Sequence, residues 1–229
     1  MALTHNPSMV RNGLVLHLDA ANVKSYPGSG TVWTDLSGQG VNGTLRNSPA
    51  VSGGKVILDG VNKDIDCGNP AALNFGTGSF TVSIWFRRTA NATGNLRLLS
   101  KAAGNDIADA ASAGFCFFGS NTNISFGVNP TAARTIISAA DFVTGEWVNA
   151  VGLVERGVSV RTYKNAVQTL TTAAPTGSVS GTTALYIGSN VGTNLYYSGE
   201  VAAVQIYNRA LTPAEIQRNF EALRGRYGI

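Results

Sequence analysis

The strongest constraint on the fold is residues 79–87, where apolar side chains occupy every second position. Side chains two residues apart on a β-strand point to the same face of the sheet, so this spacing predicts a strand with one buried face. Trp85 then points to the opposite face. No segment before residue 212 has the spacing of an amphipathic helix, which predicts an all-β domain. The residues expected on the buried face are Phe80, Val82, Ile84 and Phe86.

Many further short strands are predicted along the chain. Of its 229 residues, 27 are Gly and only 13% are charged, which favours short strands joined by tight turns. A chain of this length can bury a large core in a single domain. We expect an N-terminal arm at residues 1–12 and one two-sheet antiparallel jelly-roll sandwich at residues 13–229, with about a dozen strands. The other strands are predicted at residues 14–18, 42–45, 55–60, 96–100, 114–118, 124–128, 134–137, 147–154, 159–163, 167–171, 185–188 and 201–207.

One short C-terminal helix is predicted after the last strand. Thr212 is suited to cap its N-terminus, and Pro213 fits the first helical position. Glu215 lies three residues after the cap, where its carboxylate can accept a hydrogen bond from the backbone of the cap residue. Gly225 follows as a stop. Apolar residues four and three positions apart form the stripe expected to pack on the sheet, namely Ile216, Phe220 and Leu223.

The charges do not indicate a nucleic-acid or membrane partner. The formal net charge is +4, and the basic residues are spread along the chain. Arginines near the C-terminus are interleaved with Glu215 and Glu221, which is typical of a solvated helix face. No apolar stretch approaches the roughly 18 residues of a membrane span, and the N-terminus lacks a signal-peptide pattern. Cys67 and Cys116 are expected to be buried free thiols.

The C-terminal segment resembles a known family. Residues 207–211 read Tyr-Asn-Arg-Ala-Leu and residues 212–216 read Thr-x-x-Glu-Ile. This sequence resembles the closing segment of the laminin G-like, concanavalin A-like lectin/glucanase jelly-roll family. Ala202 and Ala203, which predict a bulge in the last strand, stand where many members carry an acidic pair.

Several other segments resemble the form of this sandwich found in structural proteins of tailed bacteriophages. The resemblance implies a non-catalytic virion protein, either a capsid decoration protein or a tail or fibre component. Its partners would be other virion proteins, and it would form a homo-oligomer in the particle. It would fold in the host cytoplasm before assembly and reside in the virion. These segments are residues 13–22, 25–30, 33–38, 42–45, 58–60 and 219–228.

Carbohydrate binding is the alternative function, with a host surface glycan as partner. Sugar sites combine an aromatic ring with polar side chains on nearby loops. The competing interpretation of each aromatic residue is packing in the sheet or at a subunit interface. The candidate platforms are Tyr26, Trp33, Trp85, Tyr196 and Tyr197, and the candidate polar neighbours are Asn190 and Asn194.

A glycosidase is the weakest of the three hypotheses. Glycosidases that resemble this sandwich carry Glu-x-Asp-x-x-Glu, because residues two apart share a strand face and both reach the scissile bond. No Glu in this chain has an Asp two positions later. His5 and His17 are the only histidines, so a Ser-His-Asp arrangement or a zinc cluster has little to build from. We therefore expect no enzymatic activity.

Calcium is the one metal that the sequence suggests. The resemblance implies an ion held by Asp and Asn oxygens at the loop rim, and calcium requires six to eight oxygen ligands. Asp and Asn also favour turns by local hydrogen bonding, so the same residues could simply shape a loop. The candidate ligands are Asp59, Asn62, Asp64 and Asp66.

Overall fold

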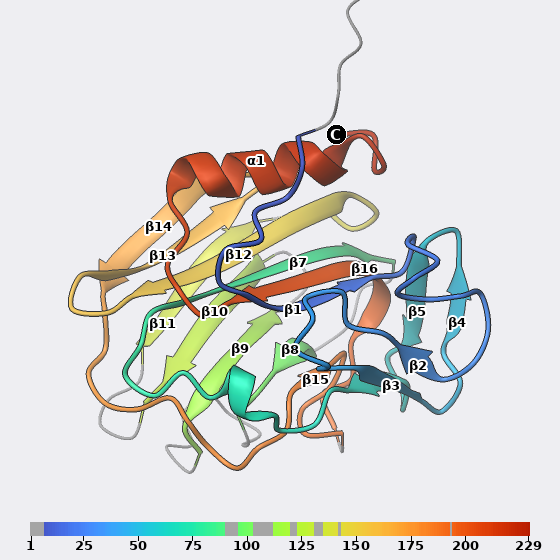
Figure 1. The fold of residues 1–229 in the computed structure, drawn as a ribbon, viewed down its shortest axis with the longest axis horizontal. Coiled ribbons are helices and arrows are strands. Elements are labelled where there is room, and N and C mark those ends of the chain that lie inside the picture. The colour runs from blue at the N-terminus through green and yellow to red at the C-terminus, as the bar shows by residue number, and fades with distance from the viewer. Residues whose placement is uncertain are drawn as a thin grey trace, which may run out of the picture.

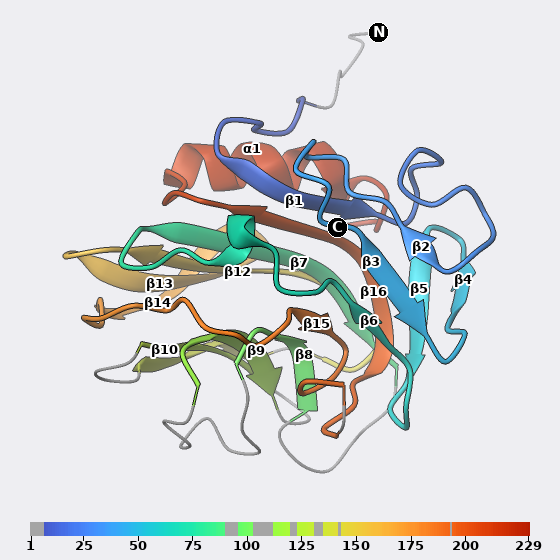
Figure 2. The same cartoon turned by 60° about the horizontal axis from the view of Figure 1, so that its bottom comes forward.

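The structure, a computed structural model, describes residues 7–89, 96–102, 112–119, 123–130, 135–141, 143–192 and 194–229, without the side chains of residues 138–141. In this part of the chain two antiparallel β-sheets face each other, and one α-helix covers the outside of one sheet (Figures 1 and 2). The predicted all-β sandwich with one C-terminal helix is therefore confirmed.

Sheet A is the sheet next to the helix. Its strand order is β14-β13-β12-β7-β16-β5-β4, and β1 also pairs with β16. The strands are β14 (Val167–Ala173), β13 (Ser159–Lys164), β12 (Trp147–Glu155), β7 (Phe80–Arg88), β16 (Ser198–Tyr207), β5 (Lys55–Asp59), β4 (Ala50–Ser52) and β1 (Leu14–Asp19).

Sheet B forms the other layer, and its middle strands lie below sheet A in Figure 2. Its strand order is β11-β10-β9-β8-β15-β6-β3-β2. The strands are β11 (Thr135–Asp141), β10 (Asn123–Asn129), β9 (Gly114–Gly119), β8 (Leu96–Ser100), β15 (Tyr186–Ile187), β6 (Asp64–Asp66), β3 (Gly43–Arg46) and β2 (Val32–Trp33). A short 3-10 helix, η1 (Ala71–Leu73), precedes β7.

Strand β7 has the predicted register. Its four alternating apolar residues are at most 1% exposed and lie in the core between the sheets. Trp85 points to the other face, where it packs with Phe220 of the helix. The two faces of this strand therefore serve two separate apolar layers.

The C-terminal helix, α1 (Pro213–Arg224), begins as predicted. The Thr212 side chain accepts a hydrogen bond from the Glu215 backbone, and the Glu215 carboxylate accepts one from the Thr212 backbone, so the capping box is complete. Ile216 and Phe220 pack on the outside of sheet A. The helix ends at Gly225.

Strand β16 contains the predicted bulge. The register with β7 shifts between Val201 and Ala203, so that β16 pairs first with β5 and then with β1 along one side. Ala202 and Ala203 are completely buried in the cluster that includes Phe220. Their small side chains allow α1 to approach the sheet closely.

Three strands were not predicted: β2, β4 and β6. Strand β6 has the sequence Asp-Ile-Asp, in which the apolar signal is one residue long. Strand β4 leads into a two-residue turn to β5 through Gly53 and Gly54, with φ of 58° and 75°. These left-handed conformations suit a tight hairpin and favour glycine at both positions.

Of the predicted arm, the structure describes residues 7–12. This segment packs on its own domain, because it lies against α1 and enters β1 directly (Figure 2). Val10 is 6% exposed and donates its backbone N–H to Asn219. Arg218 donates to the carbonyl and hydroxyl oxygens of Ser8. Residues 1–6 lie outside the described part.

Both cysteines are free and buried, as predicted. Burial raises the pKa of the Cys67 thiol above its ordinary value. Among the described residues, no helix has the length and apolar character that crossing a membrane requires.

Candidate carbohydrate-binding surface

Three predicted aromatic platforms lie inside the protein, which corrects their proposed role as exposed rings. Trp33 has no exposed area and belongs to the core between the sheets. Trp85 is 1% exposed because the rings of Phe220 and Tyr227 stack on it, with centroids at 5.5 and 4.4 Å. Tyr197 is 2% exposed, and burial raises the pKa of its hydroxyl. None of these three rings presents a face to solvent.

Tyr26, by contrast, borders an open groove of about 310 Å³. The ring is half-buried and packs against the edge of the core. Its hydroxyl donates a hydrogen bond to the carbonyl of Gly30 at 3.2 Å, which fixes the orientation of the ring. We call this hollow the Tyr26 groove. It lies between the loop after β1 and the β4–β5 turn, and its lining includes Ala21, Val23, Pro27, Val51 and Gly53.

The walls of the Tyr26 groove are held by backbone geometry. A Cβ atom at Gly54 would lie 2.7 Å from the Cβ of Ala21, so only glycine lets the β4–β5 turn approach this closely. On the other wall, the Asp19 carboxylate accepts a hydrogen bond from the Ala21 N–H at 3.0 Å. Ser25 accepts one from the Asp19 N–H at 3.1 Å. The groove is therefore formed before any ligand binds.

A second group of predicted residues lies in the loop between β15 and β16. The Asn190 side chain donates to the side-chain oxygen of Asn194 at 3.0 Å, and their backbones are also bonded. Tyr196 is half-buried, and its hydroxyl donates to the carbonyl of Gly192 at 3.0 Å. The structure therefore brings Asn190, Asn194 and Tyr196 together in this loop, whereas Tyr26 belongs to the loop after β1.

An ionic cluster supports this loop from sheet B. Arg46 donates to both carboxylate oxygens of Asp64 at 2.7 and 2.6 Å, and this hydrogen bonding raises the pKa of the guanidinium. Ser189 donates to the same carboxylate at 2.5 Å. The guanidinium also lies 4.9 Å from the centre of the Tyr186 ring, so one face of that ring is occupied. Sequence reasoning missed this cluster because its members come from three distant segments.

The predicted calcium ligands each have another partner. Burial raises the pKa of Asp59, but hydrogen bonds from the N–H groups of residues 61–63 outweigh it and lower the pKa overall. Asp64 binds Arg46, and Asp66 accepts from the Gly68 N–H. The carbonyl of Asn62 accepts from Asn47. In the described part of the chain, no three His, Cys, Asp or Glu side chains form a group that could hold a metal. Calcium binding stays a prediction.

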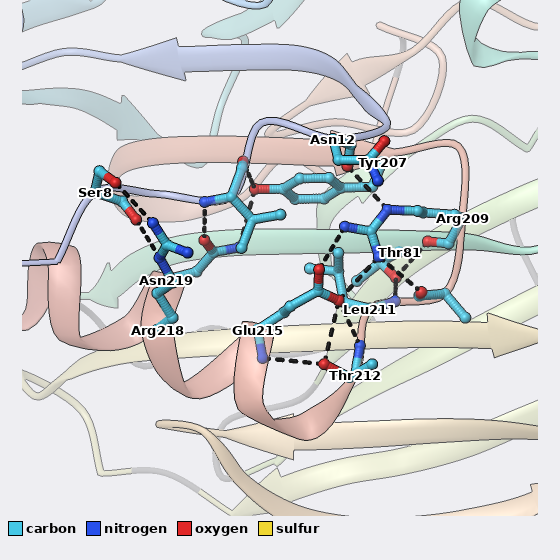
Figure 3. Close-up of polar contacts among 12 residues, drawn as sticks. Ser8, Asn12, Thr81, Tyr207, Arg209, Leu211, Thr212, Glu215, Arg218 and Asn219 are labelled. Carbon is cyan, nitrogen blue, oxygen red and sulfur yellow. Dashed lines mark hydrogen bonds and ion pairs between the residues drawn. The ribbon is translucent and has the colours of Figure 1, made fainter.

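A second hollow, of about 390 Å³, lies between residues 7–11, the outer side of β1 and the end of α1. We call it the arm cavity. Polar contacts hold its arm wall in place: Asn219 donates to the Tyr207 hydroxyl at 2.9 Å, and Tyr207 donates to the Val10 carbonyl at 3.0 Å (Figure 3). Arg209 donates to the Asn12 carbonyl at 2.9 Å beside them. The residues that line this cavity were not among the site residues predicted from the sequence.

Solved structures with the same fold include several toxin domains. The binding domain of Paraclostridial Mosquitocidal Protein 1 has a TM-score of 0.74 at 15% identity, covering 92% of this chain and 52% of that one. A structure of botulinum neurotoxin type C, whose cell entry is described as dependent upon interaction with two ganglioside molecules, has a TM-score of 0.70 at 11% identity, covering 93% and 52%. The chain thus spans about half the length of these toxin domains.

An enzyme also shares the fold. A mutant of Trypanosoma rangeli sialidase with trans-sialidase activity has a TM-score of 0.68 at 16% identity, covering 95% of this chain and 34% of that one. Identities this low establish the fold alone. No curated protein matches the chain in sequence.

The family follows from the sequence itself. The pattern of the Concanavalin A-like lectin/glucanases superfamily, in its laminin G form, matches residues 59–217. This stretch runs from the end of β5 into α1 and includes most of both sheets. The chain therefore belongs to the Concanavalin A-like lectin/glucanases superfamily.

Proposed function

We propose that this domain binds carbohydrate in the Tyr26 groove. The observation that carries the proposal is that Tyr26, an aromatic residue predicted as a sugar platform, borders an open, preformed hollow. Its volume of about 310 Å³ lies at the lower end of the range of small-molecule sites, and is of the size needed for one or two sugar units.

The chemistry of the groove suits a sugar ring. The apolar face of a pyranose can pack on the Tyr26 ring, while the polar backbone of the glycine-rich β4–β5 turn lines the groove opposite the sugar hydroxyls. Pro27 and Val51 add apolar surface on either side. Membership in a lectin superfamily supports this function, as does the ganglioside interaction described for the type C neurotoxin, which has the same fold.

The test is a glycan array followed by titration of the best neutral ligand. Tyr26→Ala should weaken binding about tenfold, since a well-placed aromatic contact contributes roughly 1–1.5 kcal/mol. Tyr26→Phe should retain binding because the ring face remains. Thermal unfolding of each variant shows whether the fold is intact.

Tyr196→Ala is the matched control. Tyr196 is also half-buried, and its hydroxyl also donates to a carbonyl four residues away. This variant should bind like the wild type. Loss of binding in Tyr196→Ala with normal binding in Tyr26→Ala would place the site in the loop between β15 and β16 and overturn the assignment to the groove.

We also propose that binding occurs without catalysis. Among the described residues that line the Tyr26 groove there is no Asp or Glu, so no acid and nucleophile pair lies beside a sugar bound there. A reducing-end assay on each polysaccharide that binds should show no cleavage. Release of new reducing ends would overturn this proposal.

A virion location is a finer proposal that rests on the motifs in residues 13–60 and 219–228. A domain of this kind could present the Tyr26 groove from a phage particle toward a host glycan. Mass spectrometry of purified particles should then detect the chain, and light scattering should show a homo-oligomer. If the chain is absent from particles released by lysis, the virion location is contradicted, but the proposal of carbohydrate binding is not affected.

A further inference from the structure

The arm cavity contains a cation without a counterion. Arg11 lines it, is exposed, and makes no hydrogen bond or ion pair through its guanidinium among the described residues. Other arginines in this part of the chain pair with carboxylates, namely Arg46, Arg87, Arg161, Arg209, Arg224 and Arg226. Arg156 and Arg218 donate to backbone carbonyls instead, whereas the Arg11 guanidinium has neither kind of partner among the described residues.

A buried imidazole lines the same cavity. His17 is 8% exposed, and its Nε2 atom is buried without a hydrogen-bond partner. Burial lowers the pKa of His17, although Asp19 and Asp35 oppose this effect, and Arg11 and Arg226 add to it. A neutral imidazole with a free nitrogen can donate a hydrogen bond to an acceptor that enters the cavity.

The net charge of the lining indicates the charge of the ligand. Arg226 also faces the cavity, but it donates to the Asp19 carboxylate at 2.8 Å, so these two charges compensate each other. His17 is neutral, which leaves the single positive charge of Arg11. This balance fits one carboxylate better than a doubly charged phosphate.

The arm cavity and the Tyr26 groove lie on the two sides of one turn. Asp19 and Asn22 line the cavity, whereas Ala20, Ala21 and Val23 line the groove. The turn is rigid, because the Ala20 N–H donates to the carbonyl of Ala202 in β16 at 2.9 Å. Two hollows separated by a fixed turn resemble neighbouring subsites for one elongated ligand.

We propose that the arm cavity binds the carboxylate of an acidic sugar unit through Arg11 and His17, next to a sugar unit on Tyr26. The preferred ligand is thus an acidic oligosaccharide such as one that contains a uronic acid. This inference rests on the proposed carbohydrate-binding function for its neighbouring subsite, but the arm cavity can be tested by itself.

The experiment is an NMR titration of the intact chain with methyl β-D-glucuronide, with methyl β-D-glucoside as the neutral probe. The glucuronide should shift the amide signals of β1 and of the end of α1 in a saturable way, and the glucoside should not. Arg11→Gln should weaken glucuronide binding about tenfold, because a charge-assisted hydrogen bond is lost. Arg11→Lys should bind with intermediate affinity.

Arg224→Gln is the matched control, since Arg224 lies near the same end of α1 but pairs with Glu221 outside the cavity. It should bind the glucuronide like the wild type, as should Tyr26→Ala. Equal binding of both probes, no saturable shift, or no effect of Arg11→Gln would overturn the inference. Stronger binding of inorganic phosphate than of the glucuronide would overturn the carboxylate assignment.

The two proposals fail separately. If a neutral glycan binds in a way that depends on Tyr26 but the glucuronide does not bind, only the acidic subsite is refuted. If the glucuronide binds in a way that depends on Arg11 but no glycan needs Tyr26 for binding, the sugar site in the Tyr26 groove is refuted. The arm cavity then stands as an independent site for acidic sugars.

Discussion

The two apolar layers on either side of β7 are built in different ways. The layer between the sheets is dominated by apolar side chains, and rings such as Phe80, Phe115 and Phe126 pack against one another. The layer under α1 combines the Trp85 and Phe220 rings with buried polar groups. The hollow beside Phe86, Leu98 and Tyr197 in the first layer measures only about 10 Å³, whereas the second layer leaves the much larger arm cavity at its edge.

The difference follows from where the residues come from in the chain. In the strands of the inner core, successive side chains point to opposite faces of the sheet, so each strand contributes every second side chain to this core. The helix layer joins the two ends of the chain, because Val10 bonds Asn219 across 209 positions. Such a junction depends on specific polar contacts, and the arm cavity lies beside them.

The largest effect is expected for Phe80→Ala in the inner core. Phe80 is fully buried and stacks on Phe75 with ring centres 4.8 Å apart. Its removal should lower the free energy of unfolding by about 4 kcal/mol, because the surrounding sheets cannot collapse into the cavity. Urea unfolding followed by tryptophan fluorescence measures this change.

Phe220→Ala is the matched substitution in the helix layer. Phe220 stacks on Trp85 from the opposite face of β7 but is 7% exposed, and it comes from a single helix that can shift. We expect a loss of about 2–3 kcal/mol. If Phe220→Ala proved as destabilising as Phe80→Ala, the contrast between a rigid core and an adjustable helix layer would be refuted.

The next largest loss of stability is expected when the polar contacts of the helix layer are removed. Asn219 accepts from the Val10 N–H and donates to Tyr207, whose burial raises the pKa of its hydroxyl to about 12. Asn219→Ala should cost about 1–3 kcal/mol, since it leaves buried groups without partners. It should also release the arm, which increased proteolysis near residues 7–12 would reveal. A stable variant with a protected arm would contradict this role.

Much of the fold could be predicted because short sequence patterns determine its local geometry. The alternation in β7, the capping box at Thr212 and the small pair at Ala202 each specify geometry within a few residues. Strand β6 escaped prediction because two of its three residues are Asp, one of which is buried by Arg46 from another strand. Its burial is a property of the assembled sheet.

The candidate site was harder to predict for the same reason. Alternation shows that Trp85 faces away from the core, but not that α1 covers it. Tyr196 and Tyr197 are adjacent and so point to different sides, yet the sequence does not indicate which one is buried. The arm cavity requires that Arg11 and Arg226, 215 positions apart, line one hollow. The Gly53-Gly54 pair is the local signal that could have indicated the Tyr26 groove.

The smallest effect is expected from the ion pair at the start of α1, and it depends on pH. Hydrogen bonds from Arg209 lower the pKa of Glu215 to about 2, below its ordinary value of 4.5. A carboxylate with a lowered pKa in the folded state stabilises the protein above pH 4.5, and this contribution is lost as the pH falls toward 2. Because the pair is partly exposed, solvent screening reduces the contribution to about 1 kcal/mol.

Glu215→Gln removes the charge but keeps a side chain that can complete the capping box. Its free energy of unfolding should be about 1 kcal/mol below that of the wild type at pH 7, and the two should converge near pH 2. Glu221→Gln is the control, since Glu221 pairs with Arg224 on the exposed side of the same helix and should contribute less. A pH-independent difference for Glu215→Gln would mean that the side chain acts through packing, and the helix layer would then resemble the inner core more closely than its ion pair suggests.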